Sequence, residues 1–329
     1  MEELPFEKIK RTILIKRKES TDSKYGCIPE KRSVEELINR GIICLNKPEG
    51  PTSHIVSEHV KKILNCKKSA HGGTLDPRVS GVLPIMINKS VKLSQYLLLA
   101  GKEYVALMHL HKDVEKEEII ETSKEFIGKI EQQVPVKSAV KRQKRFRNVY
   151  YLKILEIDGK DVLFKVGCEA GTYIRTLIHN WGQKLKVGAN MQQLVRTKAG
   201  PFNDKEWYSL QDLQDAFLDY KENKNEKELR RVIKPYEYAV SHLPKIWVFD
   251  ATVDPLCHGS RLNIPGISKI ESDIKKDDAV AVFTLKNELI GVGKSELTSE
   301  EIIKNEKGIA INMDIIGMDI NVYPKYKKE

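Results

Sequence analysis

The sequence contains few features of a secreted or membrane-inserted protein. None of its apolar runs is long enough to cross a bilayer, and its acidic start, with Glu2 and Glu3, lacks the apolar core of a secretory signal. The five cysteines are odd in number, lie far apart and include no C-x-x-C pair, which excludes a disulfide framework and a cysteine-based zinc site. We therefore expect a reduced, cytoplasmic protein that does not contact a membrane.

The sequence also lacks the motifs that mark several common enzyme classes. Neither G-x-x-x-x-G-K-[ST] nor a G-x-G-x-x-G after a predicted strand is present, so no loop that cradles a nucleotide phosphate is indicated. The metalloprotease pattern H-E-x-x-H and the hydrolase pattern G-x-S-x-G are absent as well. His109 and His111 share one face of a predicted strand, but two histidines at a strand end are more often surface residues than metal ligands. We expect no metal and no cofactor.

Basic residues are in excess, and the excess is unevenly distributed. The chain has 56 Lys and Arg against 46 Asp and Glu, a formal net charge of +10. Before Pro244 the basic residues outnumber the acidic ones by 44 to 32, whereas from Pro244 onward there are 12 basic and 14 acidic residues. The bias of the first three quarters is typical of a protein that lies along a polyanion, although scattered lysines can also serve solubility alone.

One local cluster favours a polyanionic partner over simple solubility. Six cations and no acid fall within eleven residues: Lys137, Lys141, Arg142, Lys144, Arg145 and Arg147. Like charges at this density repel one another until a polyanion neutralises them, so such stretches are typical of loops that contact phosphates. We expect Lys141, Arg142 and Lys144 to bind the substrate.

The spacing of apolar residues predicts a mixed α+β protein. Ser33 and Glu36 form a capping-box pattern, which predicts a short helix that ends before Gly41. Further helices are expected after Thr52 or Ser53 and after Thr172. Strands are predicted at residues 41–46, 82–87, 103–111, 150–157 and 162–168, and again in the segment after Pro244. These patterns indicate a catalytic body with mostly antiparallel strands flanked by helices, followed by a small β-rich domain.

The organisation of the chain follows from shifts in composition. Residues 1–32 are polar and charged, which indicates an arm without a core of its own, within an N-terminal extension at 1–40. A catalytic domain is expected at 41–235, and residues 221–234 are predicted to form a charged surface helix near its end. The β-rich domain is expected at 244–325.

The segment from His71 to Gly81 carries the most unusual pattern of polar residues. Gly72 and Gly73 permit a close approach of the backbone, and Pro77 restricts the conformation of Asp76 before it. An Asp-Pro pair alone most often marks a plain surface turn. Here the loop leads directly into the apolar residues 82–87, so Asp76 is expected in a cleft at the edge of a core.

Five segments, in order, resemble the motifs of the TruB family of pseudouridine synthases. The segments are residues 43–53, 71–77, 101–106, 169–177 and 194–202. The similarity extends to the dyskerin branch through the extension before Gly41, the loop at 135–142 and a C-terminal segment that resembles a PUA domain. Because the chain has no long lysine-rich tail, the resemblance favours the archaeal form. It implies a catalytic domain with a mixed, mainly antiparallel sheet, and a small β-barrel-like PUA domain.

The resemblance also implies roles for individual residues. Asp76 would be the carboxylate that attacks or deprotonates the ribose while the uracil is detached, and Arg175 would pair with it. Tyr104 would lie against the uracil and handle the proton at C5. Three further residues are implied as substrate-binding: Tyr173 and Leu194 would line the base pocket, and His71 would help to hold the flipped nucleotide. Lys47 and Pro48 are expected to shape the loop that supports Asp76.

The resemblance implies partners as well as chemistry, and it leaves two modes of action open. As a catalytic subunit of a box H/ACA guide RNP, the chain would bind guide RNA, rRNA substrate and three small proteins: a zinc-binding one, one of the glycine-arginine-rich family, and a kink-turn-binding protein of ribosomal type. Alternatively, it would act alone on uridine 55 of tRNA. A third reading is a non-catalytic RNA-binding scaffold, which the set Asp76, Tyr104 and Arg175 disfavours.

Overall fold

The computed structural model describes residues 2–134 and 143–325, and in this part of the chain two β-sheets organise the fold. The strand order of the large sheet is β11-β2-β4-β9-β5-β8-β7-β6, with β3 paired to β4 and β10 paired to β9. Its strands are β2 (Gly41–Lys47), β3 (Ser69–His71), β4 (Ser80–Ile87), β5 (Lys102–Leu110), β6 (Gly128–Gln133), β7 (Lys144–Asp158), β8 (Asp161–Cys168), β9 (Ala189–Ala199), β10 (Phe202–Asn203) and β11 (Ile233–Pro235). This sheet is mainly antiparallel, as the sequence predicts.

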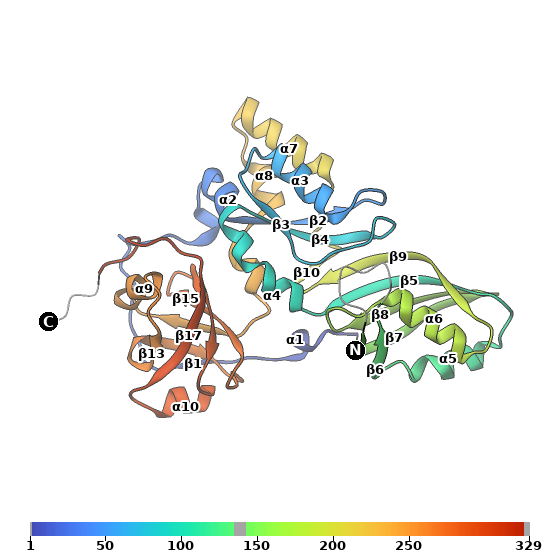
Figure 1. Cartoon of the computed structure of the whole chain (residues 1–329). Coiled ribbons are helices and arrows are strands. Elements are labelled where there is room, and N and C mark those ends of the chain that lie inside the picture. Colours follow the sequence, from blue (N-terminus) through green and yellow to red (C-terminus); the bar gives the residue numbers. More distant parts are fainter. Residues whose placement is uncertain (1, 135–142, 326–329) are drawn as a thin grey trace.

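The second sheet forms a separate body at one end of the molecule (Figure 1). Its strand order is β1-β14-β12-β15-β16-β17-β13, and β12 and β15 are parallel. Its strands are β1 (Ile13–Ile15), β12 (Lys245–Val248), β13 (Leu262–Asn263), β14 (Ile267–Glu271), β15 (Ala279–Thr284), β16 (Leu289–Ser295) and β17 (Ile309–Ile316). The β-rich C-terminal body expected from the sequence is therefore present.

Helices cover the large sheet in two groups. Trp181 of α6 packs against Phe164 of β8 and Phe126, and this core covers the β5, β8 and β9 half. Val56 and Val60 of α3 form a second core with strands β2 and β4. The helices are α1 (Pro5–Lys8), α2 (Val34–Arg40), α3 (Ser53–Ile63), α4 (Ser94–Leu99), α5 (Lys116–Lys124), α6 (Ile174–Lys184), α7 (Leu210–Asn223), α8 (Lys227–Val232), α9 (Asp250–Cys257) and α10 (Ser299–Lys304), with 3-10 helices η1 (Pro29–Lys31), η2 (Asn88–Leu93), η3 (Tyr236–Val240) and η4 (Ile264–Gly266).

The two halves of the large sheet meet at a short parallel contact between β4 and β9. Only two residue pairs are in register there in the described chain, Ser80 with Val195 and Gly81 with Arg196. Gly81 has φ +110°, and a Cβ atom at this position would lie 2.3 Å from the carbonyl oxygen of Arg196. Glycine is therefore required for β4 and β9 to approach each other, and this junction lies directly after the loop that carries Asp76.

Several local predictions are confirmed. The side chain of Ser33 accepts a hydrogen bond from the amide of Glu36, and the helix α2 ends at Arg40, before Gly41. Thr52 caps α3: its side-chain oxygen accepts a hydrogen bond from the amide of Ile55. Strand β5 buries Ala106, Met108 and Leu110 on one face, as the alternating pattern predicts.

Other predictions are wrong. Thr172 does not cap α6, because its hydroxyl donates to the Glu169 carbonyl at 2.7 Å and the helix begins two residues later. The charged stretch 221–234 is not one helix: α7 ends at Asn223, Lys224 adopts a left-handed conformation with φ 57°, and β11 joins the large sheet.

The first 32 residues form no core of their own, as predicted, but some of them pack against the rest of the chain. Leu4 is fully buried, and its side chain lies against Gly101 at the start of β5. Strand β1 adds to the C-terminal sheet by pairing Leu14 with Ile270 of β14. The N-terminal segment therefore bridges the two bodies, which its polar composition conceals because only a few apolar residues make the contacts (Figure 1).

Candidate active site

Asp76 lies in the loop between β3 and β4, and hydrogen bonds from neighbouring segments hold the backbone of this loop. The Gly72 amide donates to the Pro84 carbonyl at 2.8 Å, which fixes the start of the loop. The hydroxyl of Ser53, at the start of α3, both donates to the Leu75 carbonyl at 3.0 Å and accepts from the Leu75 amide at 2.8 Å. The Val79 amide then closes a turn onto the Asp76 carbonyl at 3.0 Å. The backbone that carries the Asp76 side chain is therefore held in place by neighbouring segments.

Lys47 supports the same loop from the end of β2. Its side chain is fully buried, and Nζ donates to the carbonyls of Pro48 and Val79 at 2.8 Å and to that of Pro77 at 3.3 Å. Burial lowers the pKa of this amine, and the Glu49 charge opposes that effect. A buried lysine that binds three carbonyls serves to hold backbone, which agrees with the supporting role expected for Lys47.

Arg175 meets Asp76 across the site. It is the second residue of α6, and its Nη2 donates to Oδ2 of Asp76 in a very short contact. Both side chains remain about half exposed, at 52% for Arg175 and 56% for Asp76. The pairing expected from the resemblance is therefore present, and its exposure leaves the Asp76 carboxylate accessible to a substrate.

Tyr104 lies on β5 beside this pair. Its neighbour across the β5–β9 register is Arg196, and it packs against the core that contains Leu75 and Ile174, which flank Asp76 and Arg175 in the sequence. Burial raises the pKa of the Tyr104 hydroxyl, while the positive charge of Arg196 opposes this increase. The phenol is therefore a neutral group at neutral pH, held at the wall of the site.

The other residues expected to contact the substrate base come from different elements. Leu194 of β9 is buried and pairs in register with Ala106 of β5, and it belongs to the same core as Leu75. Tyr173 precedes α6, and the side-chain amide of Gln132 binds both its amide and its carbonyl, at 2.9 and 3.1 Å. Gln132 therefore fixes the backbone from which Arg175 extends.

His71 ends β3 and its ring is partly buried. Its Nδ1 atom is buried and has no hydrogen-bond partner among the described residues. Burial and the charges of Arg196 and His54 lower its pKa, so the ring is neutral at pH 7. His71 thus lies near Arg196 at the edge of the loop that carries Asp76.

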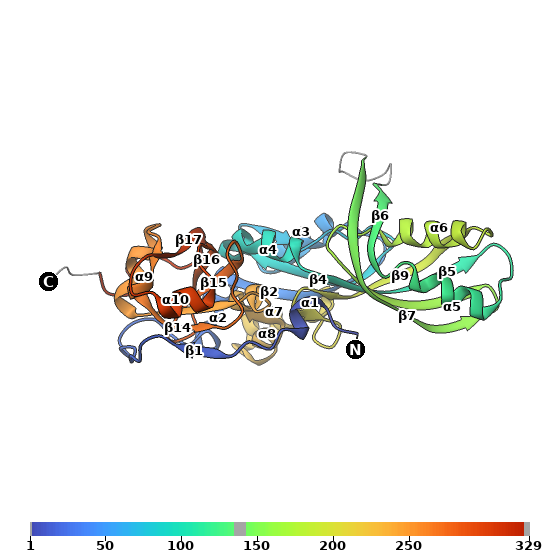
Figure 2. The same cartoon turned by 90° about the horizontal axis from the view of Figure 1, so that it is seen from below.

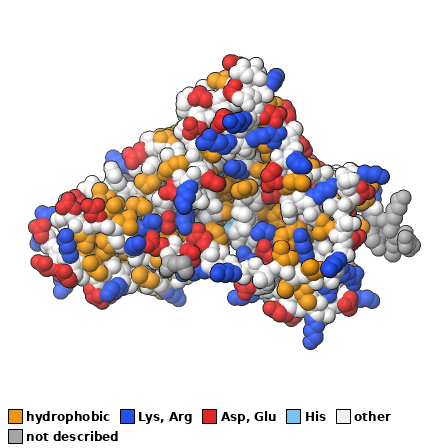
Figure 3. Space-filling model, turned by 180° about the vertical axis from the view of Figure 1, so that it is seen from behind, with side chains coloured by type: hydrophobic (Ala, Val, Ile, Leu, Met, Phe, Trp, Pro, Cys, Tyr) orange, Lys and Arg blue, Asp and Glu red, His pale blue; other side chains and the backbone are white. Residues whose placement is uncertain are grey.

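The basic cluster lies only partly within the described chain. Lys141 and Arg142 lie outside the described residues. Lys144 begins β7, where it is exposed and contacts Glu131 of β6 at 2.7 Å, so it belongs to a strand and not to a loop. The β6–β7 pair projects from the rest of the large sheet (Figure 2). On the face seen from behind, Lys and Arg are intermixed with Asp and Glu (Figure 3).

Two buried cations at the site were missed by sequence reasoning. Arg196 is 1% exposed and donates to the carbonyls of Gly73, Thr74 and Val82. Lys102 is also buried, and its Nζ donates to the carbonyls of Leu97, Leu98 and Ala100 at the end of α4, at 2.7–2.8 Å. Burial lowers the pKa of Lys102 to about 7. Neither residue stands out in the sequence, because a charged residue in a strand usually points to solvent.

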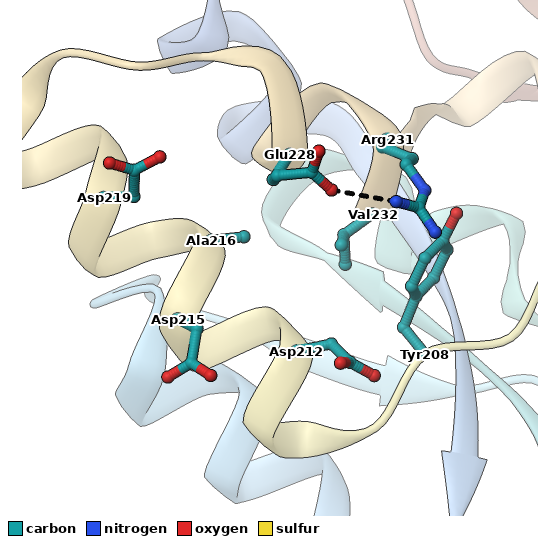
Figure 4. A pocket seen from close by; sticks show the side chains of 8 residues that line it. All are labelled: Tyr208, Asp212, Asp215, Ala216, Asp219, Glu228, Arg231 and Val232. Atoms are coloured by element: carbon teal, nitrogen blue, oxygen red, sulfur yellow. Dashed lines mark hydrogen bonds and ion pairs between the residues drawn. The ribbon is translucent and has the colours of Figure 1, made fainter.

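A pocket of about 300 Å³ lies elsewhere, between α7 and α8 (Figure 4). Acidic side chains dominate its lining, and Arg231 is paired there with Glu228 at 3.0 Å. It lies outside the Asp76 site. In the described part of the chain no group of three or more His, Cys, Asp or Glu residues is arranged to hold a metal ion. No helix in that part is long and apolar enough to span a membrane.

The arrangement is suited to chemistry on a base-sized substrate. An accessible carboxylate is oriented by an arginine, and a phenol and an apolar side chain lie beside it on neighbouring strands. A carboxylate of this kind can act as a nucleophile or as a general base. The phenol can transfer a proton, and the apolar wall can bind a planar ring.

Comparison with known protein families gives matches along almost the whole chain. Residues 61–174 match the TruB family pseudouridylate synthase N-terminal domain, and residues 175–241 match the tRNA pseudouridylate synthase B C-terminal domain. Residues 244–316 match the PUA domain, and residues 1–57 match the DKCLD (NUC011) domain. All the residues of the site described above lie within these matches.

Relatives and solved structures agree with the family matches. A probable tRNA pseudouridine synthase B of Pyrococcus horikoshii is 53% identical over 319 residues, which cover 96% of either chain. Its counterpart in Methanopyrus kandleri is 48% identical over 322 residues, covering 98% of this chain and 95% of the relative.

Two similar structures have high TM-scores. A Cbf5-Nop10-Gar1 complex contains a chain with a TM-score of 0.94 and 51% identity, covering 98% of this chain and 99% of that one. The second is a chain of an H/ACA RNP bound to a substrate RNA containing 2'-deoxyuridine. It has a TM-score of 0.93 and 48% identity, and the match covers 99% of this chain and 100% of that one. On this similarity and on its domain matches, the chain belongs to the TruB family of pseudouridine synthases, which are isomerases.

Proposed function

We propose that the chain isomerises uridine to pseudouridine in RNA, with Asp76 as the catalytic carboxylate, as the catalytic subunit of a box H/ACA guide RNP. The observation that carries this proposal is the accessible Asp76–Arg175 pair beside Tyr104. A non-catalytic scaffold has no use for a half-exposed ion pair beside a tyrosine in this arrangement.

The reaction is balanced without any co-reactant. The bond between N1 of uracil and C1′ of ribose breaks, the base turns, and a bond from C5 to C1′ forms. The proton at C5 is lost to a base and N1 gains a proton, so no redox change occurs. In this proposal Asp76 assists the breaking of the glycosidic bond, either as nucleophile or as base, and Tyr104 receives the C5 proton. Arg175 orients the carboxylate.

Substrate binding is assigned to side chains around this centre. Tyr173 and Leu194 line the base pocket, and His71 helps to hold the nucleotide that has left its stack, at a cost of a few kcal/mol for flipping. Lys141, Arg142 and Lys144 contact phosphates of the RNA. The exposure of Lys144 on the projecting β6–β7 pair supports this assignment.

The guided mode is supported by the similar structures described as an H/ACA RNP with substrate RNA and a Cbf5-Nop10-Gar1 complex. The proposed partners are guide RNA, rRNA substrate and three small proteins: a zinc-binding one, one of the glycine-arginine-rich family and a kink-turn-binding one. The relatives described as probable tRNA pseudouridine synthase B favour action on uridine 55 of tRNA as a second mode.

The domain division and the cellular location complete the proposal. Residues 1–40 form an extension, 41–235 the catalytic domain and 244–325 an RNA-binding PUA domain. The five cysteines are all free, which fits a reducing, cytoplasmic compartment.

The experiment measures tritium release from uridine labelled at C5. The pure protein is incubated with tRNA transcript, and with rRNA substrate in the presence and absence of guide RNA and partner proteins. Asp76→Ala is expected to abolish release and to leave RNA binding nearly unchanged, whereas the control Asp215→Ala, on α7, is expected to behave as wild type. Collapse of RNA binding in Asp76→Ala would refute the assigned role.

The pattern of release then separates the two modes. Release only with guide RNA and partners identifies an RNP subunit whose specificity lies in base pairing. Release from tRNA by the protein alone identifies a self-sufficient tRNA synthase. No release under any of these conditions would favour the scaffold.

A further inference from the structure

The guanidinium of Arg196 connects the loop that carries Asp76 to the strand that follows it. Its Nη2 donates to the Gly73 carbonyl at 2.9 Å, and its Nη1 donates to the Thr74 carbonyl at 3.3 Å. Its Nε donates to the Val82 carbonyl of β4 at 2.7 Å. One side chain thus holds both ends of the segment in which Asp76 lies.

The charge of Arg196 has no counter-ion in the described part of the chain. The side chain is 1% exposed, and its hydrogen bonds to Gly73, Thr74 and Val82 go to backbone carbonyls and not to a carboxylate. A buried guanidinium is ordinarily paired with an acid, because taking a charge out of water is costly. Carbonyl dipoles offset only part of that cost. The positive charge of Arg196 therefore also stabilises negative charge on other polar groups close to it.

One polar group that this charge reaches is the hydroxyl of Tyr104. Tyr104 and Arg196 are directly opposite each other in the β5–β9 register, so their side chains extend from the same face of the sheet. The backbone of Arg196 is itself fixed by the contact with Gly81, where no Cβ atom has room. A positive charge at this position favours the ionised phenol over the neutral one, and it opposes the effect of burial on the pKa of Tyr104.

We propose that Arg196 is a positioning residue of the reaction, which acts through Asp76 by fixing its loop and through Tyr104 by presenting a positive charge to the phenol oxygen. This inference rests on the proposed isomerisation. In the last step the neutral phenol of Tyr104 gives its proton to N1 of the turned base and receives the C5 proton in its place, while the electron pair of the C–H bond returns to the uracil ring. Arg196 stabilises the negative charge that develops on the phenol oxygen between these two transfers.

The two effects of Arg196 are separable by substitution. Arg196→Lys keeps the charge, but a single amine cannot bind all three carbonyls in the same way. Arg196→Gln keeps an amide donor for the loop and removes the charge. Lys198→Met is the matched control, since Lys198 lies on the same strand, and its charge is paired with Glu7 at 2.8 Å.

The test measures single-turnover isomerisation of saturating RNA that carries either protium or deuterium at C5. Arg196→Gln is expected to slow the reaction by about 100-fold, because misplacement of a catalytic group by about 1 Å costs this much. It is also expected to raise the ratio of the protium to the deuterium rate above that of wild type, because removal of the C5 proton becomes slower than the other steps. Arg196→Lys is expected to have an intermediate rate with the wild-type ratio.

Each outcome decides the inference. Rates of both variants within about threefold of wild type, or a slow Arg196→Gln with the wild-type isotope ratio, would overturn it. If Arg196→Gln does not fold, Arg196→Lys decides alone: an intermediate rate with the wild-type ratio supports the inference, and any other result overturns it. An active wild type with unaffected variants refutes only this inference, whereas a wild type that never releases the C5 hydrogen refutes the proposed function, and this inference with it.

Discussion

Arg32 and Glu237 form a buried ion pair with two hydrogen bonds, at 2.8 and 2.9 Å, between residues 205 positions apart. Oε1 of Glu237 also accepts from the Leu289 amide of β16 at 3.1 Å, and the Arg32 guanidinium lies 5.3 Å from the centre of the Tyr236 ring. Burial raises the pKa of Glu237, and the bonds from Arg32 oppose this. The pair therefore ties the N-terminal extension, the η3 segment and the C-terminal sheet together.

Removal of one partner of this pair is expected to destabilise the protein. Arg32→Ala leaves a buried carboxylate unpaired, so the free energy of unfolding is expected to fall by about 3–5 kcal/mol. The measurement is urea denaturation followed by fluorescence. Arg17→Ala, which removes an exposed pair with Glu306, is the control and is expected to cost less than about 1 kcal/mol. Equal losses for the two variants would contradict the prediction.

Arg175 is expected to affect catalysis without affecting stability. Arg175→Met removes the group that orients the Asp76 carboxylate, so the rate of C5 tritium release is expected to fall at least about 100-fold, with RNA affinity unchanged. The matched control is Lys184→Met, because Lys184 lies on the same helix and makes a similarly exposed pair with Glu125. A loss of activity no larger than that of the control would show that the pair is structural.

The basic segment is expected to control the salt dependence of RNA binding. Replacement of Lys141, Arg142 and Lys144 together by Ala is expected to weaken RNA affinity. Each lost phosphate contact reduces the slope of log K against log[salt] by about 0.7–0.9, so the slope is expected to flatten by about 2–3. Filter binding at several salt concentrations measures this slope. Replacement of Lys221, Lys224 and Lys227, in the α7–α8 region, is the control. An unchanged slope after replacement of Lys141, Arg142 and Lys144 would show that these cations do not contact RNA phosphates and serve solubility alone.

His242 is expected to make the stability sensitive to acid. Its Nδ1 is buried and has no partner among the described residues, and its ring lies 5.8 Å from the ring of Phe6 in α1. Burial lowers the pKa of His242 to about 4. Since this pKa is depressed in the folded protein, the unfolded chain binds the proton more readily, and stability is lost as the pH falls from about 6.5 to about 4, by up to about 1.4 kcal/mol per pH unit.

Urea denaturation at pH 7, 5.5 and 4.5 checks this dependence. His242→Leu is expected to remove the part of the acid loss that His242 causes, whereas His59→Asn, at an exposed position of α3, is expected to keep it. The same acid loss in His242→Leu as in wild type would contradict the assignment.

Local features of the fold were predictable because their causes are local. The Ser33–Glu36 capping box, the alternating burial of β5 and the cap at Thr52 each depend on residues a few positions apart. The exception at Thr172 is instructive: its hydroxyl binds the Glu169 carbonyl, so the chain turns once more before α6 begins. A cap pattern does not reveal such a competing acceptor.

The sequence by itself determined the order of the motifs and the loop that carries Asp76, and through its resemblance to the family it predicted roles for Asp76, Tyr104 and Arg175. Only the tertiary structure decided which cations are buried. Arg196 binds the Gly73 carbonyl 123 positions away, and strand β1 finds its partner β14 more than 250 positions along the chain. A charged side chain can be buried only where carbonyls of distant segments accept its hydrogen bonds. A pattern of neighbouring residues does not show where those carbonyls will lie.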